Sequence, residues 1–327
     1  MKGVDVSVVT VPDAVVATDV DALFDRVESF THHAPVSEPK RTSLLHALTA
    51  TGPSAVGSTG AEGPGPGRQV AAVVARRHDG RLEAVAPVVG DLRTREFSAE
   101  IAVDPDVSDP AAVIDALVGA VSDLVSARQG RILRLWVTRA TTTDDRRMDA
   151  HGFGTERDLI QMRCRLPLET PVGGSGDGEA IRTRPFRPGS DDEAWLTTNN
   201  RAFETHPEQG HWDLSTFVER QQEPWFDPEG LLLLEEDGRV AGSCWTKVHA
   251  DTDPPMGEIY VIGVDPDFRG RGWGRALTRA GLDFLSGRGL RVGMLYVDGD
   301  NEAAVGLYRS MGFVEDHVDR CYRRDFT

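Results

Sequence analysis

A turn rich in glycine and arginine lies at Arg269-Gly270-Arg271-Gly272-Trp273-Gly274. An apolar strand, expected over residues 258–264, precedes this turn and ends at Asp265-Pro266. A helix, expected over residues 272–286, follows it. Glycines let backbone N–H groups approach a ligand closely, and a helix N-terminus adds partial positive charge. The turn therefore predicts a site for a pyrophosphate group.

This arrangement resembles the acetyl-CoA signature of the GNAT N-acetyltransferases, (Gln/Arg)-x-x-Gly-x-(Gly/Ala), which follows their fourth strand. Arg269, Gly272 and Gly274 occupy the specified positions. The resemblance implies that the turn holds the pyrophosphate of acetyl-CoA. A lone glycine-rich sequence also occurs as an ordinary tight turn, so the interpretation depends on the strand before it and the elements after it.

Acetyl transfer to an amine requires a base for the amine proton and an acid for the departing thiolate. Glu258 opens the strand before the turn and is the candidate base; the alternative is a solvated strand residue. Tyr308 lies on the last expected helix and is the candidate acid, although such a tyrosine elsewhere would pack on the sheet. The Val264 amide could polarise the thioester carbonyl, as in an oxyanion hole.

Three other segments could line a cleft. Asn301-Glu-Ala-Ala-Val-Gly306 opens the last helix with small residues that would let a pantetheine or adenine group approach. His206-Pro-Glu-Gln-Gly-His-Trp212 is a polar loop that could form a substrate rim, and Lys247 lies on a strand beside the proposed site. The alternatives are helix packing, a surface loop and a solvated lysine.

The elements that would position these residues follow the order β-α-α-β-β-β-α-β-α-β, which matches the GNAT fold. Asp237-Gly238 between two apolar runs predicts a hairpin, and Asn301 predicts a helix N-cap. The expected strands are 181–184, 231–235, 239–248, 258–264 and 292–297, the expected helices are 191–203, 215–222, 272–286 and 301–310, and a strand pair is expected from residue 313.

The chain repeats itself at a spacing of about 160 residues. Val-Asp-Pro-Asp at 103–106 recurs at 264–267, and Gly152-Phe153 recurs as Gly312-Phe313. Leu135-Trp-Val recurs as Leu295-Tyr-Val, and Gly80-Arg-Leu as Gly238-Arg-Val. Matches in the same order indicate a tandem duplication. We therefore expect an α/β (α+β) protein of two tandem GNAT domains, each a central mixed sheet flanked by helices.

The glycine- and serine-rich segment 169–179 predicts a linker between a domain at 1–168 and a catalytic domain at 180–327. A second low-complexity segment, 51–67, predicts a loop inside the first domain. After Asp106 the first domain continues with Val-Ser-Asp-Pro110, which has no glycine or arginine, so its turn is poorly suited to a pyrophosphate. Only the second domain is expected to bind acetyl-CoA and to be catalytic.

Composition limits the partners. The 327 residues carry a formal net charge of −16, which argues against a general nucleic-acid surface. The sequence shows no apolar run near 18 residues, and its first residues lack the apolar core of a signal peptide. We therefore expect no membrane span. The 3 cysteines are widely spaced and show no metal-ligand pattern. We therefore expect buried free thiols in a reducing cytoplasm and no bound metal. We also expect a monomeric chain.

Several strings between residues 159 and 327 resemble the mycothiol synthases, a tandem GNAT family that acetylates the cysteinyl amine of cysteinyl-glucosaminyl-inositol. They include Leu159-Ile-Gln-Met-Arg163, Asn199-Asn-Arg-Ala-Phe203, Trp225-Phe-Asp-Pro-Glu-Gly230 and Trp245-Thr-Lys-Val-His249. Before residue 159 the resemblance is confined to Ala34-Pro-Val-Ser-Glu38. The implied reaction is acetyl transfer from acetyl-CoA to this amine, which completes mycothiol.

Carried across by position, the resemblance implies three sets of site residues. Glu258 would be the base and Tyr308 the acid. The thiol pseudodisaccharide would contact Glu38, Glu208, Lys247, Glu258 and Tyr296. Acetyl-CoA would contact Ile262, Gly263, Val264, Arg269, Gly270, Arg271, Gly272, Trp273, Gly274, Arg275, Asn301, Glu302, Ala303, Ala304, Val305 and Gly306.

Two other functions fit parts of the sequence. A tandem GNAT enzyme could act on another amine, such as an aminoglycoside or a protein N-terminus, and mainly acidic walls would then favour a polycation. A non-catalytic acyl-CoA sensor would not need Glu258 and Tyr308, and both are present.

Overall fold

The computed structural model describes residues 5–9, 14–31, 36–49, 68–168, 182–204, 206 and 209–327. The chain forms two compact units, one of residues 1–159 with 318–327 and one of residues 160–317. The predicted linker 169–179 and the predicted loop 51–67 lie outside the described residues. Residues 318–327, which the sequence assigned to the second domain, belong to the first unit.

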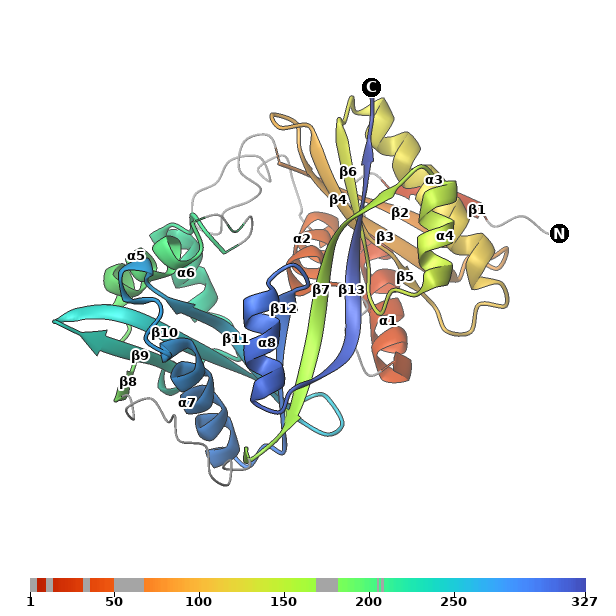
Figure 1. Ribbon diagram of the computed structural model, residues 1–327. Helices are drawn as coiled ribbons and strands as arrows, with labels where there is room; N and C mark the ends of the chain where they lie inside the picture. The colour runs from red at the N-terminus through yellow and green to blue at the C-terminus, as the bar shows by residue number, and fades with distance from the viewer. Residues whose placement is uncertain are drawn as a thin grey trace. The chain divides into compact units, whose positions relative to one another are not determined.

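The first unit has a mixed sheet covered by helices (Figure 1). Strands β1 to β4 pair antiparallel in sequence order, β4 pairs parallel with β6, and β13 pairs antiparallel with β6. The elements are β1 Asp5–Val9, α1 Ala14–Thr31, α2 Glu38–Thr49, β2 Arg68–Arg76, β3 Leu82–Asp91, β4 Glu96–Glu100, β5 Ala102–Val103, α3 Pro110–Ala127, β6 Ile132–Val137, α4 Thr142–Ala150, the start of β7 Gly154–Arg165 and most of β13 Val314–Asp325.

Helix α3 is long and apolar enough to cross a membrane by length and composition. It corrects the expectation that no such segment exists. Val113, Leu117 and Val121 of this helix are buried in the same core as Phe97 and Leu133 of the sheet. This packing is that of a core helix, which passes the same test of length and hydropathy.

The second unit repeats the plan, with antiparallel pairing from β8 through β11 and a parallel pair between β11 and β12. Helix α7 packs Leu277, Leu282 and Leu285 into a core that it shares with β10 and β11. The elements are the rest of β7, β8 Thr183–Pro185, α5 Asp192–Ala202, α6 Leu214–Gln221, β9 Leu231–Glu236, β10 Arg239–His249, β11 Met256–Val264, the 3-10 turn η3 Pro266–Phe268, α7 Trp273–Gly287, β12 Val292–Asp298 and α8 Glu302–Ser310.

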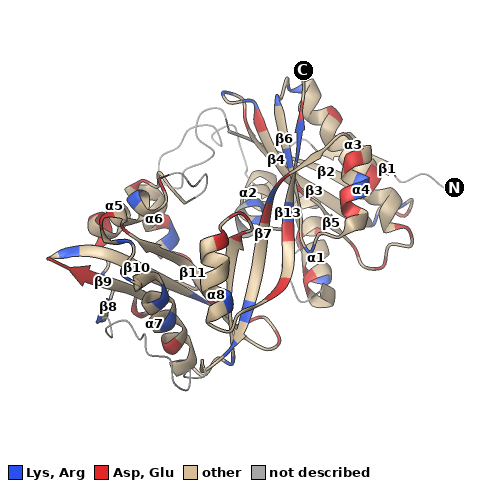
Figure 2. Ribbon diagram, in the orientation of Figure 1, with Lys and Arg blue, Asp and Glu red and all other residues tan. Residues whose placement is uncertain are grey.

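The fold class predicted from the sequence is confirmed, and most elements of the second half lie within two residues of their predicted limits. The hairpin turn at Asp237-Gly238 has positive φ at both residues, 51° and 73°, as its sequence predicted. The strand pair expected from residue 313 is wrong: one continuous strand, β13, runs from Val314 to Asp325. Basic and acidic residues occur along the ribbon of both units (Figure 2).

Candidate functional site

Asp265 fixes the point at which β11 ends and the glycine-rich turn begins. Its carboxylate is 1% exposed, accepts a hydrogen bond from the Asp267 N–H at 2.9 Å and pairs with Arg201 Nε at 2.7 Å. Burial opposes ionisation of this carboxyl, but the Arg201 and Asp267 hydrogen bonds outweigh it, so the pKa of Asp265 lies below its ordinary value. The ionised aspartate therefore holds the turn against helix α5.

The turn itself needs glycine at two positions because of its backbone. Gly270 and Gly272 have φ values of 80° and 78°, which side-chain-bearing residues rarely adopt. Gly272 is the N-cap of α7, and among the described residues no side chain makes the capping hydrogen bond to this helix. The first N–H groups of a helix lack carbonyl partners within it, so the start of α7 presents backbone donors and a positive dipole end to an anion.

The arginines of the turn are partly committed to the protein. Arg269 Nη2 donates to the Ala202 carbonyl at 2.9 Å, and Arg275 Nη2 donates to Ser310 Oγ at 2.5 Å. The Arg271 guanidinium lies 5.0 Å from the Trp273 ring centre. These contacts brace the turn while keeping three positive charges beside it. Gly274 has no positive φ, and a Cβ atom there would make only an ordinary van der Waals contact, with Leu307 at 3.8 Å. The fold alone therefore does not require glycine at this position.

Strands β11 and β12 separate beside the turn. Their parallel pairing ends at Ile259 opposite Leu295, although β11 continues to Val264 and β12 to Asp298. An irregularity in the pairing of β10 with β11 leaves Tyr260 without an opposite residue just beyond this point. Residues 262–264 are half-buried. The separation leaves their backbone without a β12 partner, in the segment predicted to contact the acetyl group.

The segment Asn301–Gly306 contributes less side-chain chemistry than predicted. Asn301 Oδ1 accepts from the Ala304 N–H at 3.1 Å and thereby caps α8. Val305 is buried in the core of the unit. Glu302 and Ala303 are exposed. Contacts from this segment to a cofactor would therefore come chiefly from small exposed groups and backbone.

Glu258 is a buried carboxylate, 8% exposed, on the last paired stretch of β11. Its Oε2 lies 2.7 Å from Nε2 of His249 on the neighbouring strand β10. The sequence analysis missed His249. The period of two in a strand places His249 on the same face of β10 as Lys247, but only the register between β10 and β11 brings it to Glu258.

Tyr308 is buried, 7% exposed, among core residues that include Cys244 and Phe313. Desolvation, with a smaller contribution from the neighbouring Cys244, raises the pKa of Tyr308 to about 12. The phenol thus keeps its proton throughout the neutral range. Ile259 belongs to the same core, so Glu258, one residue before it on β11, faces the opposite side of the sheet from Tyr308.

Two of the predicted acceptor contacts lie in defined surroundings. The Lys247 ammonium lies 4.4 Å from the Trp225 ring centre and 5.7 Å from that of Tyr260, which stabilises a cation. Tyr296 is 38% exposed, and its Oη accepts from Gln161 Nε2 at 2.7 Å. In the sheet Lys247 lies opposite Glu258, so the structure brings the candidate base and a cation together.

The polar loop that precedes α6 is tied to α5. Asn199 Nδ2 donates to the Gln209 carbonyl at 2.9 Å, and Asn200 exchanges two hydrogen bonds with the Trp212 backbone. Glu208 lies outside the described residues. Glu38 begins α2 in the first unit, and its side chain is likewise outside the described part of the structure. The predicted roles of both glutamates stay predictions.

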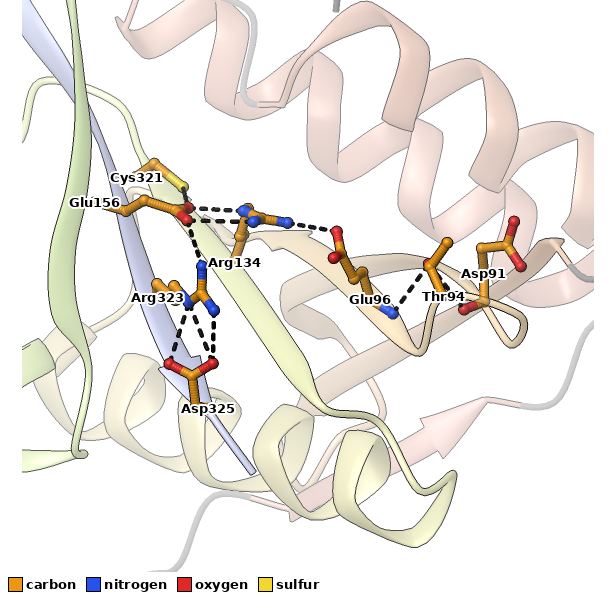
Figure 3. Close-up of polar contacts among 8 residues, drawn as sticks. All are labelled: Asp91, Thr94, Glu96, Arg134, Glu156, Cys321, Arg323 and Asp325. Carbon is orange, nitrogen blue, oxygen red and sulfur yellow. Dashed lines mark hydrogen bonds and ion pairs between the residues drawn. The ribbon is translucent and has the colours of Figure 1, made fainter. Parts of the chain in front are cut away.

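The first unit has a hollow of about 390 Å³ between β3, β4 and β6. Its charged walls are already neutralised, since Arg134 pairs with Glu96 at 2.8 Å and with Glu156 at 2.7 Å. Figure 3 shows this network continuing from Glu156 to Arg323. The hollow contains neither a glycine turn nor an uncapped helix start among its lining residues, so it does not resemble the site of the second unit.

The cysteines are free and buried, as predicted. Desolvation raises the pKa values of the Cys164 and Cys244 thiols to about 12, which makes them poor nucleophiles. Within the described ranges, no group of three or more metal-binding side chains comes together.

Comparison with known proteins matches residues 193–313 to the acetyltransferase (GNAT) family. The mycothiol acetyltransferase of Geodermatophilus obscurus is 42% identical over 265 residues, which span 80% of this chain and 84% of that protein. That of Streptomyces coelicolor is 36% identical over 293 residues, 89% and 90% of the two chains. That of Thermobispora bispora is 52% identical over 198 residues, 60% of this chain and 66% of its own length.

Solved structures with the same fold include a GCN5-related N-acetyltransferase from Sphaerobacter thermophilus, with a TM-score of 0.68 and 23% identity over 98% of this chain and 95% of that one. A tandem GNAT protein from the clavulanic acid biosynthesis pathway has a TM-score of 0.66 and 15% identity over 98% of each chain. These two likenesses support the tandem fold alone.

Proposed function

Since this chain belongs to the mycothiol acetyltransferases, a family of acetyl-transferring GNAT enzymes, we propose that it transfers acetyl from acetyl-CoA to the cysteinyl amine of cysteinyl-glucosaminyl-inositol, the last step of mycothiol biosynthesis. The observation that carries this proposal is the helix start at Gly272, which has no side-chain cap and follows the separated strand β11 after the short turn η3. A pyrophosphate there would place a thioester near residues 262–264.

In this proposal the base and the acid act from the two faces of the sheet. Glu258 takes a proton from the cysteinyl ammonium, and the free amine attacks the thioester carbonyl. Tyr308 gives its proton to the departing thiolate of coenzyme A and regains one from water before the next turnover. Its raised pKa keeps the phenol protonated until that transfer. The Val264 amide stabilises the oxyanion formed between these steps.

Acceptor recognition is assigned to Lys247 and Tyr296 in the second unit, and by resemblance alone to Glu38 and Glu208. Lys247 and Glu258 give the site charges of both signs, which suits a sugar conjugate that bears one ammonium. The runner-up, a polycationic amine such as an aminoglycoside, would encounter the Lys247 charge. We also propose that the protein acts as a monomer in a reducing cytoplasm. The free thiols support the reducing compartment.

An acceptor competition tests the proposal. The purified chain is given acetyl-CoA with equal concentrations of cysteinyl-glucosaminyl-inositol, an aminoglycoside and a peptide with a free N-terminus, and products are followed by mass spectrometry. Preferential N-acetylation of the first acceptor is expected. Preference for either other amine would replace the substrate, and acetyl-CoA binding without any acetylated product would favour the sensor.

A further inference from the structure

The proposed reaction must release a proton from a buried site. An ammonium has three N–H protons and the amide product retains one, so two protons leave the nitrogen. One ends on the thiol of coenzyme A and the other goes to water. Glu258 takes up the first before the amine attacks, and it must lose that proton before it can take the second. A base that is only 8% exposed therefore needs a route by which its proton reaches water within each turnover.

The position of His249, between Glu258 and solvent, offers such a route. Its Nε2 lies 2.7 Å from Glu258 Oε2, and its side chain is 23% exposed, against 10% for that of Glu258. Register pairs Glu258 with Lys247 and His249 with Met256, so the imidazole reaches diagonally across the strands to the carboxylate. Within the described ranges no hydrogen bond or ion pair reaches Oε1, which leaves that oxygen for the amine.

The nearest charged neighbour of His249 along β10 is a cation. Lys247 lies two residues from His249 on the same face of β10. Its ammonium lies over the Trp225 and Tyr260 rings.

We propose that His249 is a positioning residue that holds Glu258 Oε2 and carries the amine proton from Glu258 to water. The inference rests on the proposed function, in which Glu258 is the base. In the resting site the Nε2–H of His249 donates to Glu258 Oε2. After the carboxyl group has accepted the amine proton and rotated, exchange with water moves the ring proton to Nδ1, Nε2 takes the carboxyl proton, and Glu258 is a carboxylate again. The imidazolium then loses its Nδ1 proton to water, which restores the Nε2–H tautomer, so no other reactant is needed.

His249→Gln separates holding from proton transfer. The glutamine amide can donate a hydrogen bond to Glu258, but it cannot accept and release a proton near neutral pH. We expect kcat to fall about tenfold, less than the 10²–10⁴ typical of a direct acid or base, while both KM values stay within twofold. In His249→Ala, added imidazole is expected to restore kcat in a concentration-dependent manner.

The first unit offers a matched control. His151 Nε2 lies 3.2 Å from Asp115 Oδ1, and its side chain is 26% exposed, close to that of His249. His151→Gln should leave kcat and its response to imidazole unchanged. Thermal unfolding of each variant checks that it is folded.

Two results would overturn the inference: wild-type kcat in His249→Gln, or a loss in His249→Ala that imidazole does not restore. Glu258→Gln distinguishes this failure from failure of the proposed function. If Glu258→Gln loses kcat by about 10²–10⁴ and His249 variants do not respond as expected, only the role of His249 is wrong. If Glu258→Gln keeps normal turnover with chemistry rate-limiting, Glu258 is not the base and both proposals fall.

Discussion

Asp104 in the first unit and Asp265 in the second occupy the same position in two copies of one turn. Asp104 accepts from the Asp106 N–H at 3.0 Å and pairs with Arg26 and Arg81 at 2.9 and 2.8 Å. Asp265 accepts from the Asp267 N–H, pairs with Arg201 of α5 and lies 3.8 Å from Arg239. Arg81 and Arg239 come from corresponding hairpins, so the duplication extends to individual ion pairs.

The copies differ a few residues further along. In the first unit Asp109 caps α3, with its carboxylate accepting from the Ala112 N–H at 3.1 Å, and Pro110 at the helix start has no N–H. In the second unit Gly272 caps α7 without a side chain. The first unit thus fills its helix start with its own anion, whereas the second leaves that place to a ligand. Retaining the fold and retaining the anion site are separate requirements.

The largest effect should follow from giving the second unit the cap of the first. Gly272→Asp would place a carboxylate where the pyrophosphate is expected. Each hydrogen bond to a charged group contributes about 1.5–3 kcal/mol, so loss of two should weaken acetyl-CoA binding by at least about 100-fold in calorimetry. Gly238→Asp is the control, since Gly238 also has positive φ and an open Cβ position. Unaltered binding in Gly272→Asp would break the comparison.

A smaller loss is expected from the buried tyrosine of the second unit. Tyr308→Phe should lower kcat by about 10- to 100-fold, at or below the range for a general acid because water can partly replace it. Tyr322 is the corresponding control, a buried tyrosine of the first unit that donates to Asp145 at 2.7 Å. Tyr322→Phe should cost stability and spare kcat. Equal kcat losses in both variants would show a structural effect instead.

The raised pKa of Tyr308 also predicts a pH dependence of stability. The value is about 12 in the folded chain and about 10 for an ordinary tyrosine. Its contribution to stability is fully present below about pH 10 and is lost as pH rises through about 12. Chemical denaturation across this range should show a smaller alkaline loss in Tyr308→Phe than in the native sequence, and identical slopes would contradict the assignment.

Strand β10 of the second unit differs from its counterpart β3 in the first unit. Lys247 adds a cation to β10, whereas β3 of the first unit has no charged residue from Ala84 to Gly90. Lys247→Met should raise the acceptor KM by about tenfold, the lower end for loss of a hydrogen bond to a charged group, and leave the acetyl-CoA KM unchanged. Steady-state kinetics with each substrate varied provides the measurement. A change confined to the acetyl-CoA KM would reassign Lys247 to the cofactor.

The smallest difference is expected at the shared aspartates. Asp104→Asn and Asp265→Asn should each destabilise the chain by about 1–3 kcal/mol in urea unfolding, but only Asp265→Asn should weaken acetyl-CoA binding. Hydrogen bonds and ion pairs outweigh burial and lower the pKa of both carboxyls. Their stabilisation is therefore present above the ordinary pKa of aspartate and is lost as pH falls through the lowered values. Equal effects on binding would contradict separate roles.

The sequence predicted the elements of the second half because its strands, helix caps and glycine turns carry local signals. Asn301 as a cap and Gly238 as a hairpin residue are examples. The prediction of a strand pair at the end of the chain was wrong. Gly312-Phe313 marks a turn before β13, but no local signal shows that this strand continues to Asp325. The partner of Glu258 was missed because a diagonal contact between strands depends on register, which the pairing of β10 with β11 sets.

The glycine turn shows both the strength and the limit of the sequence. Its motif located the helix start at Gly272, and the structure added the reason, an uncapped α7 beside a separated strand pair. The resemblance also implied that Arg269, Arg271 and Arg275 contact acetyl-CoA. The structure shows that Arg269 and Arg275 also bond to Ala202 and Ser310. Such tertiary hydrogen bonds leave no local pattern in the sequence.

Titration calorimetry of the full chain with acetyl-CoA tests the central claim most directly. Because Asp109 occupies the helix start of the first unit and Gly272 leaves that of the second open, the expected stoichiometry is one acetyl-CoA per chain, and Gly272→Asp should remove this binding. Two sites of comparable affinity, or one site that persists in Gly272→Asp, would contradict the account.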